Sequence, residues 1–232
     1  MNLNKVISVF IGIFIFTTGN TMASKNEDPS WTLVIQAASV ISNNSKNVVA
    51  LLESARKDNN IKTDDSVFNK EALKNFEKND TYYDFIEEDT DLEDIPFSVF
   101  KTTMIGYGYM SYIDWKDLSS SENMTWVLNE LFKEVKLKNL NKTEIKKIDN
   151  SVNSILTEPY SIEKQILATN SMIKTIGEVV ANRNFRVLWY VENSDSYSFF
   201  IVKPEVYQKL NNTKIGYDRE FKEPKFSLKD LE

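Results

Sequence analysis

Apolar residues in the first part of the chain recur at the spacing of an amphipathic helix. They keep one helical phase over residues 30–56, and only the polar residues 43–45 interrupt them. This pattern predicts one long helix, or two helices separated at that polar interruption. A shorter helix is predicted around residues 69–78, and an acidic segment follows at residues 80–94.

Three later helices are predicted from residues that cap helix N-termini. Ser119 with Glu122, and Asn141 with Glu144, have the spacing of a capping box, in which two side chains bond the free amides of the first turn. Ser161 stands before a third run. Apolar residues follow each of these positions at helical spacing. We therefore expect capped helices after Ser119, Asn141 and Ser161.

The period changes from helical to alternating near residue 185. Two apolar runs, separated by the polar residues 193–196, extend to residue 203 and predict a β-hairpin. Pro204 then ends the hairpin and starts a short helix. The charged tail from about residue 211 is expected to be loosely ordered.

The stretch IGYGYMSYIDWKD, residues 105–117, is predicted as a strand. Both of its faces are largely apolar, which suits a central strand packed on two sides, and its glycines allow a close neighbour. At its end Asp114, Trp115, Lys116 and Asp117 place an indole between charges, as expected of a contact with a ligand or partner. A structural alternative is that Asp117 or a nearby serine only prepares the cap of the next helix.

The order of helices, one strand, helices and a hairpin indicates the fold class. We expect an α+β domain in which helices pack on a small, mostly antiparallel β-sheet. No internal boundary is visible, so residues 24–232 are predicted to form a single domain.

The first residues have the features of a secretory signal peptide. Lys5 precedes an apolar run at residues 6–16, which is shorter than the roughly 20 residues of a membrane span, and Thr21-Met22-Ala23 has the small residues of a cleavage site. We expect residues 1–23 to be removed and Ser24 to begin the mature chain. The protein would then be periplasmic or secreted, without a stable membrane anchor.

Composition narrows both the compartment and the chemistry. The chain has 232 residues, no cysteine, no histidine and a net charge of −6. A cysteine-free exported protein is more typical of a bacterial envelope than of a disulfide-rich secreted domain, and the acidic balance argues against nucleic acid as a partner. We also expect a monomer.

The missing residue types exclude several kinds of active site. Without histidine or cysteine there is no Ser-His-Asp or Cys-His catalysis and no imidazole or thiolate zinc site. Asp89, Asp91 and Glu93 are spaced like the start of a calcium loop, but Asp94 and Phe100 stand where an EF-hand has Gly and Glu. We expect no cofactor and no metal site.

Two short motifs resemble those of an uncharacterised bacterial family, of the domain-of-unknown-function type. The first is a strand with GY and then a hydrophobic residue before DWK; the second is an aromatic hairpin containing DSY. The matching residues are Gly108, Tyr109, Ile113, Asp114, Trp115, Lys116, Leu188, Trp189, Asp195, Ser196, Tyr197, Phe199 and Phe200. The resemblance covers roughly the second half of the chain and implies a similar α+β arrangement but no activity.

Two hypotheses of function remain. The first is a non-catalytic binding protein, of the immunity or inhibitor type, whose acidic segment meets an exported protein with a basic surface. The second is an envelope hydrolase that uses Asp114 and another carboxylate on a sugar or cell-wall substrate; its catalytic residues are otherwise unknown. The candidate binding residues are Tyr112, Asp114, Trp115, Lys116, Asp117, Asp195 and Tyr197.

Overall fold

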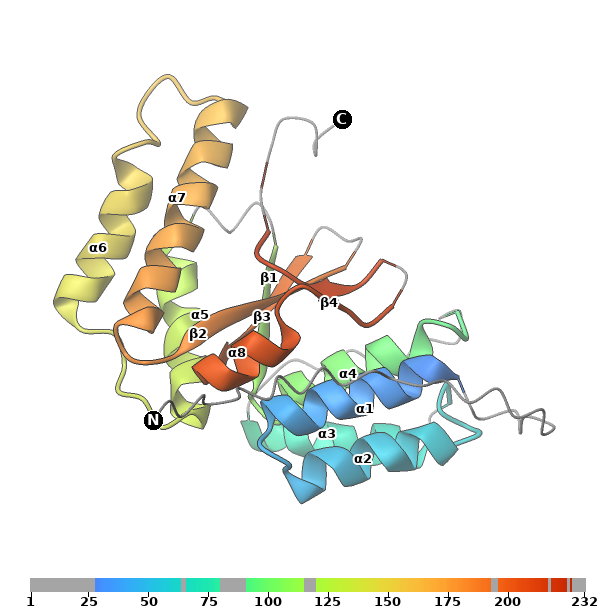
Figure 1. The fold of residues 1–232 in the computed structure, drawn as a ribbon. Helices are drawn as coiled ribbons and strands as arrows, with labels where there is room; N and C mark the ends of the chain where they lie inside the picture. Colours follow the sequence, from blue (N-terminus) through green and yellow to red (C-terminus); the bar gives the residue numbers. More distant parts are fainter. Residues whose placement is uncertain are drawn as a thin grey trace, which may run out of the picture.

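An antiparallel β-sheet lies between two groups of helices (Figure 1). The computed structural model describes residues 28–63, 66–79, 91–114, 120–192, 196–216, 218–224 and 226. In this part of the chain the sheet has five strands in the order β1-β3-β2-β5-β4, and every pairing is antiparallel. The strands are β1 (Met110–Asp114), β2 (Arg186–Val191), β3 (Ser196–Val202), β4 (Thr213–Lys214) and β5 (Glu220–Phe221). The predicted α+β fold is confirmed.

The first group of helices covers one face of the sheet. It consists of α1 (Pro29–Ile41), α2 (Lys46–Lys57), α3 (Val67–Asn79) and α4 (Ile95–Gly106). The predicted break between the first two is confirmed, because Asn43 and Asn44 have φ angles of 52° and 60°. This left-handed conformation cannot continue a right-handed helix, and Asn adopts it more easily than most residues.

Helix α4 corrects the prediction of a strand from residue 105. Ile105 and Gly106 form the last turn of α4, residues 107–109 form a turn, and the strand begins only at Met110. Most of α4 is buried, including Phe97, Phe100 and Thr103. A helix buried on nearly all sides has no polar stripe, so its sequence cannot be distinguished from that of a buried strand.

Strand β1 also lies elsewhere in the sheet than expected. It is an edge strand paired with β3, and not a central one. Its two faces are nevertheless both packed, since Met110 belongs to the core beneath α1–α4 and Ile113 to the core on the opposite side. The apolar character of both faces therefore reflects helices above and below the strand, not neighbouring strands on both edges.

The second group of helices covers the other face. It consists of α5 (Ser121–Glu134), α6 (Lys142–Asn153) and α7 (Ile162–Ala181). The capping box of Asn141 and Glu144 is confirmed, as is the cap at Ser161. For α5 the cap is Ser120, whose hydroxyl accepts a hydrogen bond from the Asn123 amide at 3.3 Å, and not Ser119, which lies outside the described residues. Consecutive serines are equivalent caps by residue type, so the sequence left the starting register of this helix open.

The end of the chain is more regular than its composition suggested. The β2–β3 hairpin and the short helix α8 (Pro204–Leu210) are confirmed. After Asn211, where we expected a loosely ordered tail, the structure places β4 and β5, with Ile215 and Phe221 almost completely buried. A few apolar residues within a charged segment therefore complete the sheet.

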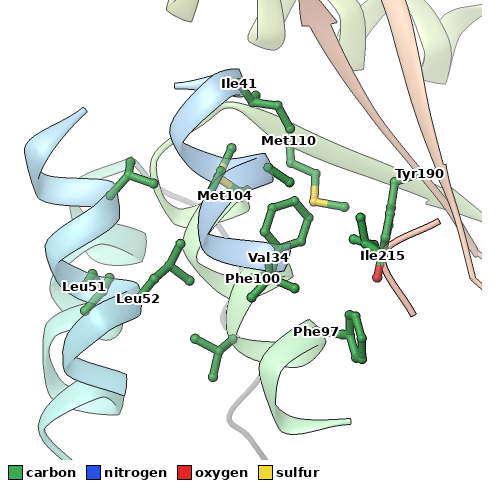
Figure 2. Packing of buried hydrophobic residues seen from close by; sticks show 14 of the residues in the cluster. Val34, Ile41, Leu51, Leu52, Phe97, Phe100, Met104, Met110, Tyr190 and Ile215 are labelled. Atoms are coloured by element: carbon green, nitrogen blue, oxygen red, sulfur yellow. The ribbon is translucent and has the colours of Figure 1, made fainter. Parts of the chain in front are cut away.

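The sheet divides the hydrophobic core into two halves. Along β2, Leu188 and Tyr190 face α1–α4, whereas Val187 and Trp189 face α5–α7. Figure 2 shows the first half, in which Phe97, Phe100 and Met104 of α4 pack among residues from α1, α2 and the sheet. Among the described helices none is both long and apolar enough to cross a membrane.

Candidate functional site

Strand register brings the two sequence motifs to the same end of the sheet. Asp114, the last residue of β1, lies opposite Ser196, the first residue of β3. The DWK segment therefore leaves the sheet next to the point where the DSY segment enters it. The candidate residues Trp115, Lys116, Asp117 and Asp195 lie outside the described residues, as does the acidic segment at 80–90.

The two candidate tyrosines that the structure describes lie on opposite faces of the sheet. Tyr112 is 44% exposed and shares a face with Met110, on the side of α1–α4. Tyr197 lies opposite Ile113 and packs against the core beneath α5–α7. The structure therefore separates these two side chains, which the sequence had placed in one candidate set.

Two ion pairs join helix α4 to this end of the sheet. Glu192, which follows β2, pairs with Lys101 of α4, and its side chain is only 11% exposed. Arg219, which precedes β5, pairs with Asp94 at the start of α4 at 2.5 Å, and it stacks over the Phe97 ring at 4.3 Å. We call Asp94, Lys101, Glu192 and Arg219 the charged rim.

Tyr190 lies buried beside the charged rim. Burial raises the pKa of its phenol far above the ordinary range, the Glu192 and Asp94 carboxylates raise it further, and Arg219 acts in the opposite direction. The phenol therefore keeps its proton at neutral pH and can only donate or accept a hydrogen bond as the neutral form. Directly opposite on β3, the hydroxyl of Ser198 is buried without a hydrogen-bond partner among the described residues.

The charged rim has no local signal in the sequence, because its ion-pair partners are far apart in the chain. The Lys101–Glu192 and Asp94–Arg219 contacts span 91 and 125 residues. Asp94 before Ile95-Pro96 is a helix-start signal that could have been read locally, since Asp is a good N-cap and proline favours the first turn. Nothing around Arg219 in the sequence indicates its partner.

The described residues contain no cluster of three or more acidic side chains that could hold a metal ion. The acids whose pKa is lowered are instead held by structural partners. Burial raises the pKa of Asp58, but hydrogen bonds from the Asn60 amide, the Ser66 hydroxyl and the Phe68 amide lower it more. These contacts join the α2–α3 loop to the start of α3.

A family model described as Domain of unknown function (DUF6630) matches residues 50–221. The chain belongs to this family. No curated protein and no solved structure matches the chain. The DUF6630 match begins within α2 and ends at the last residue of β5, so it includes the charged rim and the segments that carry both motifs. Helix α1 and the residues after Phe221 lie outside the match.

Proposed function

We propose that this DUF6630 protein is an exported, non-catalytic binding protein, of the immunity or inhibitor type. The observation that supports this most is the meeting of the two motif segments and the charged rim at one end of the sheet. Segments distant in sequence that meet at strand ends are a common basis for recognition surfaces. The protein would act in the periplasm or outside the cell.

The expected partner is a protein with a basic surface. The chain has a net charge of −6, and its acidic segment leads through the exposed residues Asp91 and Glu93 into α4. Within the charged rim each cation already has a carboxylate partner. A basic patch on the partner would meet the exposed carboxylates of Asp91 and Glu93 beside the charged rim. Opposite charges favour association and raise the rate of encounter.

The second candidate remains an envelope hydrolase, because the register supplies a second carboxylate. The row that contains Asp114 and Ser196 continues toward Glu192, which follows β2. Two strand spacings of about 4.8 Å separate the backbones of Asp114 and Glu192, roughly 10 Å in all. Inverting glycosidases use two carboxyl groups about 6.5–9.5 Å apart, which is the carboxyl separation that this candidate requires of Asp114 and Glu192. Glu192, however, is paired with Lys101.

Co-purification from the native envelope separates the two candidates. We expect the tagged mature chain to retain a basic protein partner in a stoichiometric complex that weakens at high salt. Asp114→Ala and Lys116→Ala should weaken this complex while changing the free energy of unfolding by about 0.5 kcal/mol or less. Lys146→Ala, which removes an exposed charge from α6, is the matched control and should leave the complex intact.

A substitution of the core residue Ile113 should lower stability, in contrast to the surface substitutions at Asp114 and Lys116. Ile113 is 6% exposed, so Ile113→Ala should lower the free energy of unfolding by about 2 to 5 kcal/mol through lost burial and a cavity. If Asp114→Ala unfolds the protein as readily as Ile113→Ala, the binding role of Asp114 is wrong. Digestion of isolated cell wall by the purified chain, lost in Glu192→Gln, would favour the hydrolase instead.

A further inference from the structure

A side chain of α7 pairs with the backbone of the C-terminal segment in the manner of a neighbouring strand. The Asn170 amide nitrogen donates to the Phe226 carbonyl oxygen at 3.0 Å, and the Phe226 amide donates to the Asn170 side-chain oxygen at 3.2 Å. One carboxamide thus satisfies both backbone groups of a single residue. Such pairing depends on an extended backbone and not on the side chain that the residue carries.

The aromatic ring of Phe226 has a second, specific contact. It meets the Tyr197 ring edge-to-face, with centroids 4.8 Å apart and an interplanar angle of 66°. This geometry is favourable for two aromatic rings beyond the area that they bury. Both rings pack against the core beneath α5–α7, and Tyr197 lies next to Ser196 at the start of β3. The contact is therefore adjacent to the strand end that carries the candidate binding residues.

The family match includes only one of the two partners in this contact. Asn170 and Tyr197 lie within the residues matched by DUF6630, whereas Phe226 lies beyond them. We propose that Asn170 and Tyr197 form a site that binds an extended peptide segment with an aromatic residue, and that Phe226 occupies this site in cis. The proposal rests on the protein-binding function proposed above and names the part of the partner that is recognised.

The segment that occupies the site also indicates the charge of the partner. In the sequence Lys222 and Lys225 stand close to Phe226, while the chain as a whole has a net charge of −6. A partner segment with lysine beside an aromatic residue combines the contacts of Phe226 with the basic character expected from the net charge. The partner must compete with a tethered segment, whose effective concentration is in the millimolar range for a short linker.

The test uses a synthetic peptide of residues 222–232 as the probe and the mature chain, residues 24–232, as the receptor. Binding is followed by NMR, through the Asn170 side-chain amide and the Tyr197 ring signals. We expect the Phe226→Ala chain to bind the peptide at least about tenfold more tightly than the native chain, because the tethered competitor is weakened. A peptide with alanine in place of its phenylalanine should bind at least about tenfold more weakly.

Further variants separate binding from folding. Asn170→Asp, in the Phe226→Ala chain, keeps the side-chain size but removes the amide donor, and it should abolish the peptide-induced shifts of the Tyr197 ring signals. If Phe226→Ala does not fold, Phe226→Leu keeps apolar burial without the ring and should also bind the peptide more tightly than the native chain. Equal affinity of the native and Phe226 variants, or unchanged binding in Asn170→Asp, would overturn the proposal. In that case a basic partner retained by co-purification, and lost in Asp114→Ala, would still support the proposed function.

Discussion

At the scale of single residues, two glycines have different reasons for lacking a side chain. Gly108, in the turn between α4 and β1, has a φ angle of 74°, and a Cβ atom there would lie 2.7 Å from Cγ of Glu134. Gly177, within α7, would have no atom within 4 Å of an added Cβ. Only the first position therefore requires glycine, both for its backbone conformation and for space.

Alanine substitutions at Gly108 and Gly177 should therefore have opposite effects on the free energy of unfolding. Gly108→Ala should lower the free energy of unfolding by about 1 to 2 kcal/mol, because an L-residue is strained in the left-handed region. Gly177→Ala should raise it by about 0.5 to 1 kcal/mol, because alanine loses less conformational freedom in a helix. Urea unfolding of both variants measures the difference. A neutral Gly108→Ala would show that the turn does not need the positive φ angle.

Glu144 joins the α6 cap to the end of α7 and should make stability depend on pH. Arg183 donates from Nε to its carboxylate at 2.9 Å, and the Asn141 amide donates at 2.8 Å. The side-chain hydrogen bond from Arg183 lowers the pKa of Glu144 most, and the Asn141 amide lowers it further. A carboxyl group with a lowered folded-state pKa stabilises the protein above its unfolded pKa, and this contribution is lost as pH falls through the folded value.

Glu144→Gln should therefore destabilise the protein at pH 7 by about 1 to 3 kcal/mol, the usual range for hydrogen bonds to a charged group. The difference from the native chain should shrink as pH falls below the ordinary Glu pKa. Urea unfolding from pH 7 to pH 3 measures it. Glu178→Gln, which removes an exposed ion pair with Lys147 between the same two helices, is the control and should have little effect at either pH.

At the scale of elements, the short strands after α8 belong to the core. Phe221 of β5 is fully buried and contacts the rings of Tyr190 and Phe100, at centroid distances of 5.7 and 6.5 Å. A Cβ added to Gly216, in the turn between β4 and β5, would lie 2.6 Å from Phe97. The hairpin of β4 and β5 is therefore packed closely on α4.

Phe221→Ala should lower the free energy of unfolding by about 3 to 5 kcal/mol, because it leaves a cavity among aromatic rings. Lys222→Ala, at the next residue, removes an exposed side chain that pairs with Glu220, and it should change the free energy of unfolding by about 0.5 kcal/mol or less. Thermal unfolding of the two variants provides the comparison. Similar midpoints for both would mean that β5 contributes nothing to the stability of the sheet.

At the scale of the whole molecule, the sheet is shared by two cores, and the described fold begins after the predicted signal peptide. Helix α1 starts at Pro29, and the Asp28 carboxylate caps it by accepting from the Ser30 amide at 2.8 Å. Trp31, Val34 and Ala38 of α1 are buried in the first core. Removal of residues 1–23 would therefore leave every described element intact.

We predict that the exported protein begins at Ser24. The small residues Thr21 and Ala23 before this position have the pattern that signal peptidase recognises, so the protein recovered from the envelope fraction should have the intact mass of residues 24–232. A variant with Ala23→Lys should accumulate with the uncut mass. Recovery of the native chain at full length in the membrane pellet would reject the prediction.

Local features of the sequence determined most of the elements. The Asn141–Glu144 capping box, the Ser161 cap, the break at Asn43–Asn44 and the β2–β3 hairpin are all local, because caps, left-handed residues and side-chain period act over a few neighbours. The order of these elements along the chain was sufficient to predict the α+β fold class. Short local motifs likewise indicated Asp114 and Tyr197 as candidate binding residues.

Only the tertiary structure decided how these elements and their side chains are arranged in space. It made residues 95–106 a helix, placed β1 at an edge, and put Tyr112 and Tyr197 on opposite faces of the sheet. It also set Asp114 beside Ser196 and joined Asp94 to Arg219 across 125 residues. A fully buried helix has no polar period, and an ion pair between distant residues leaves no spacing in the chain. Both are decided by packing in three dimensions, since the free energy of burial depends on which surfaces come together and not on their order in the sequence.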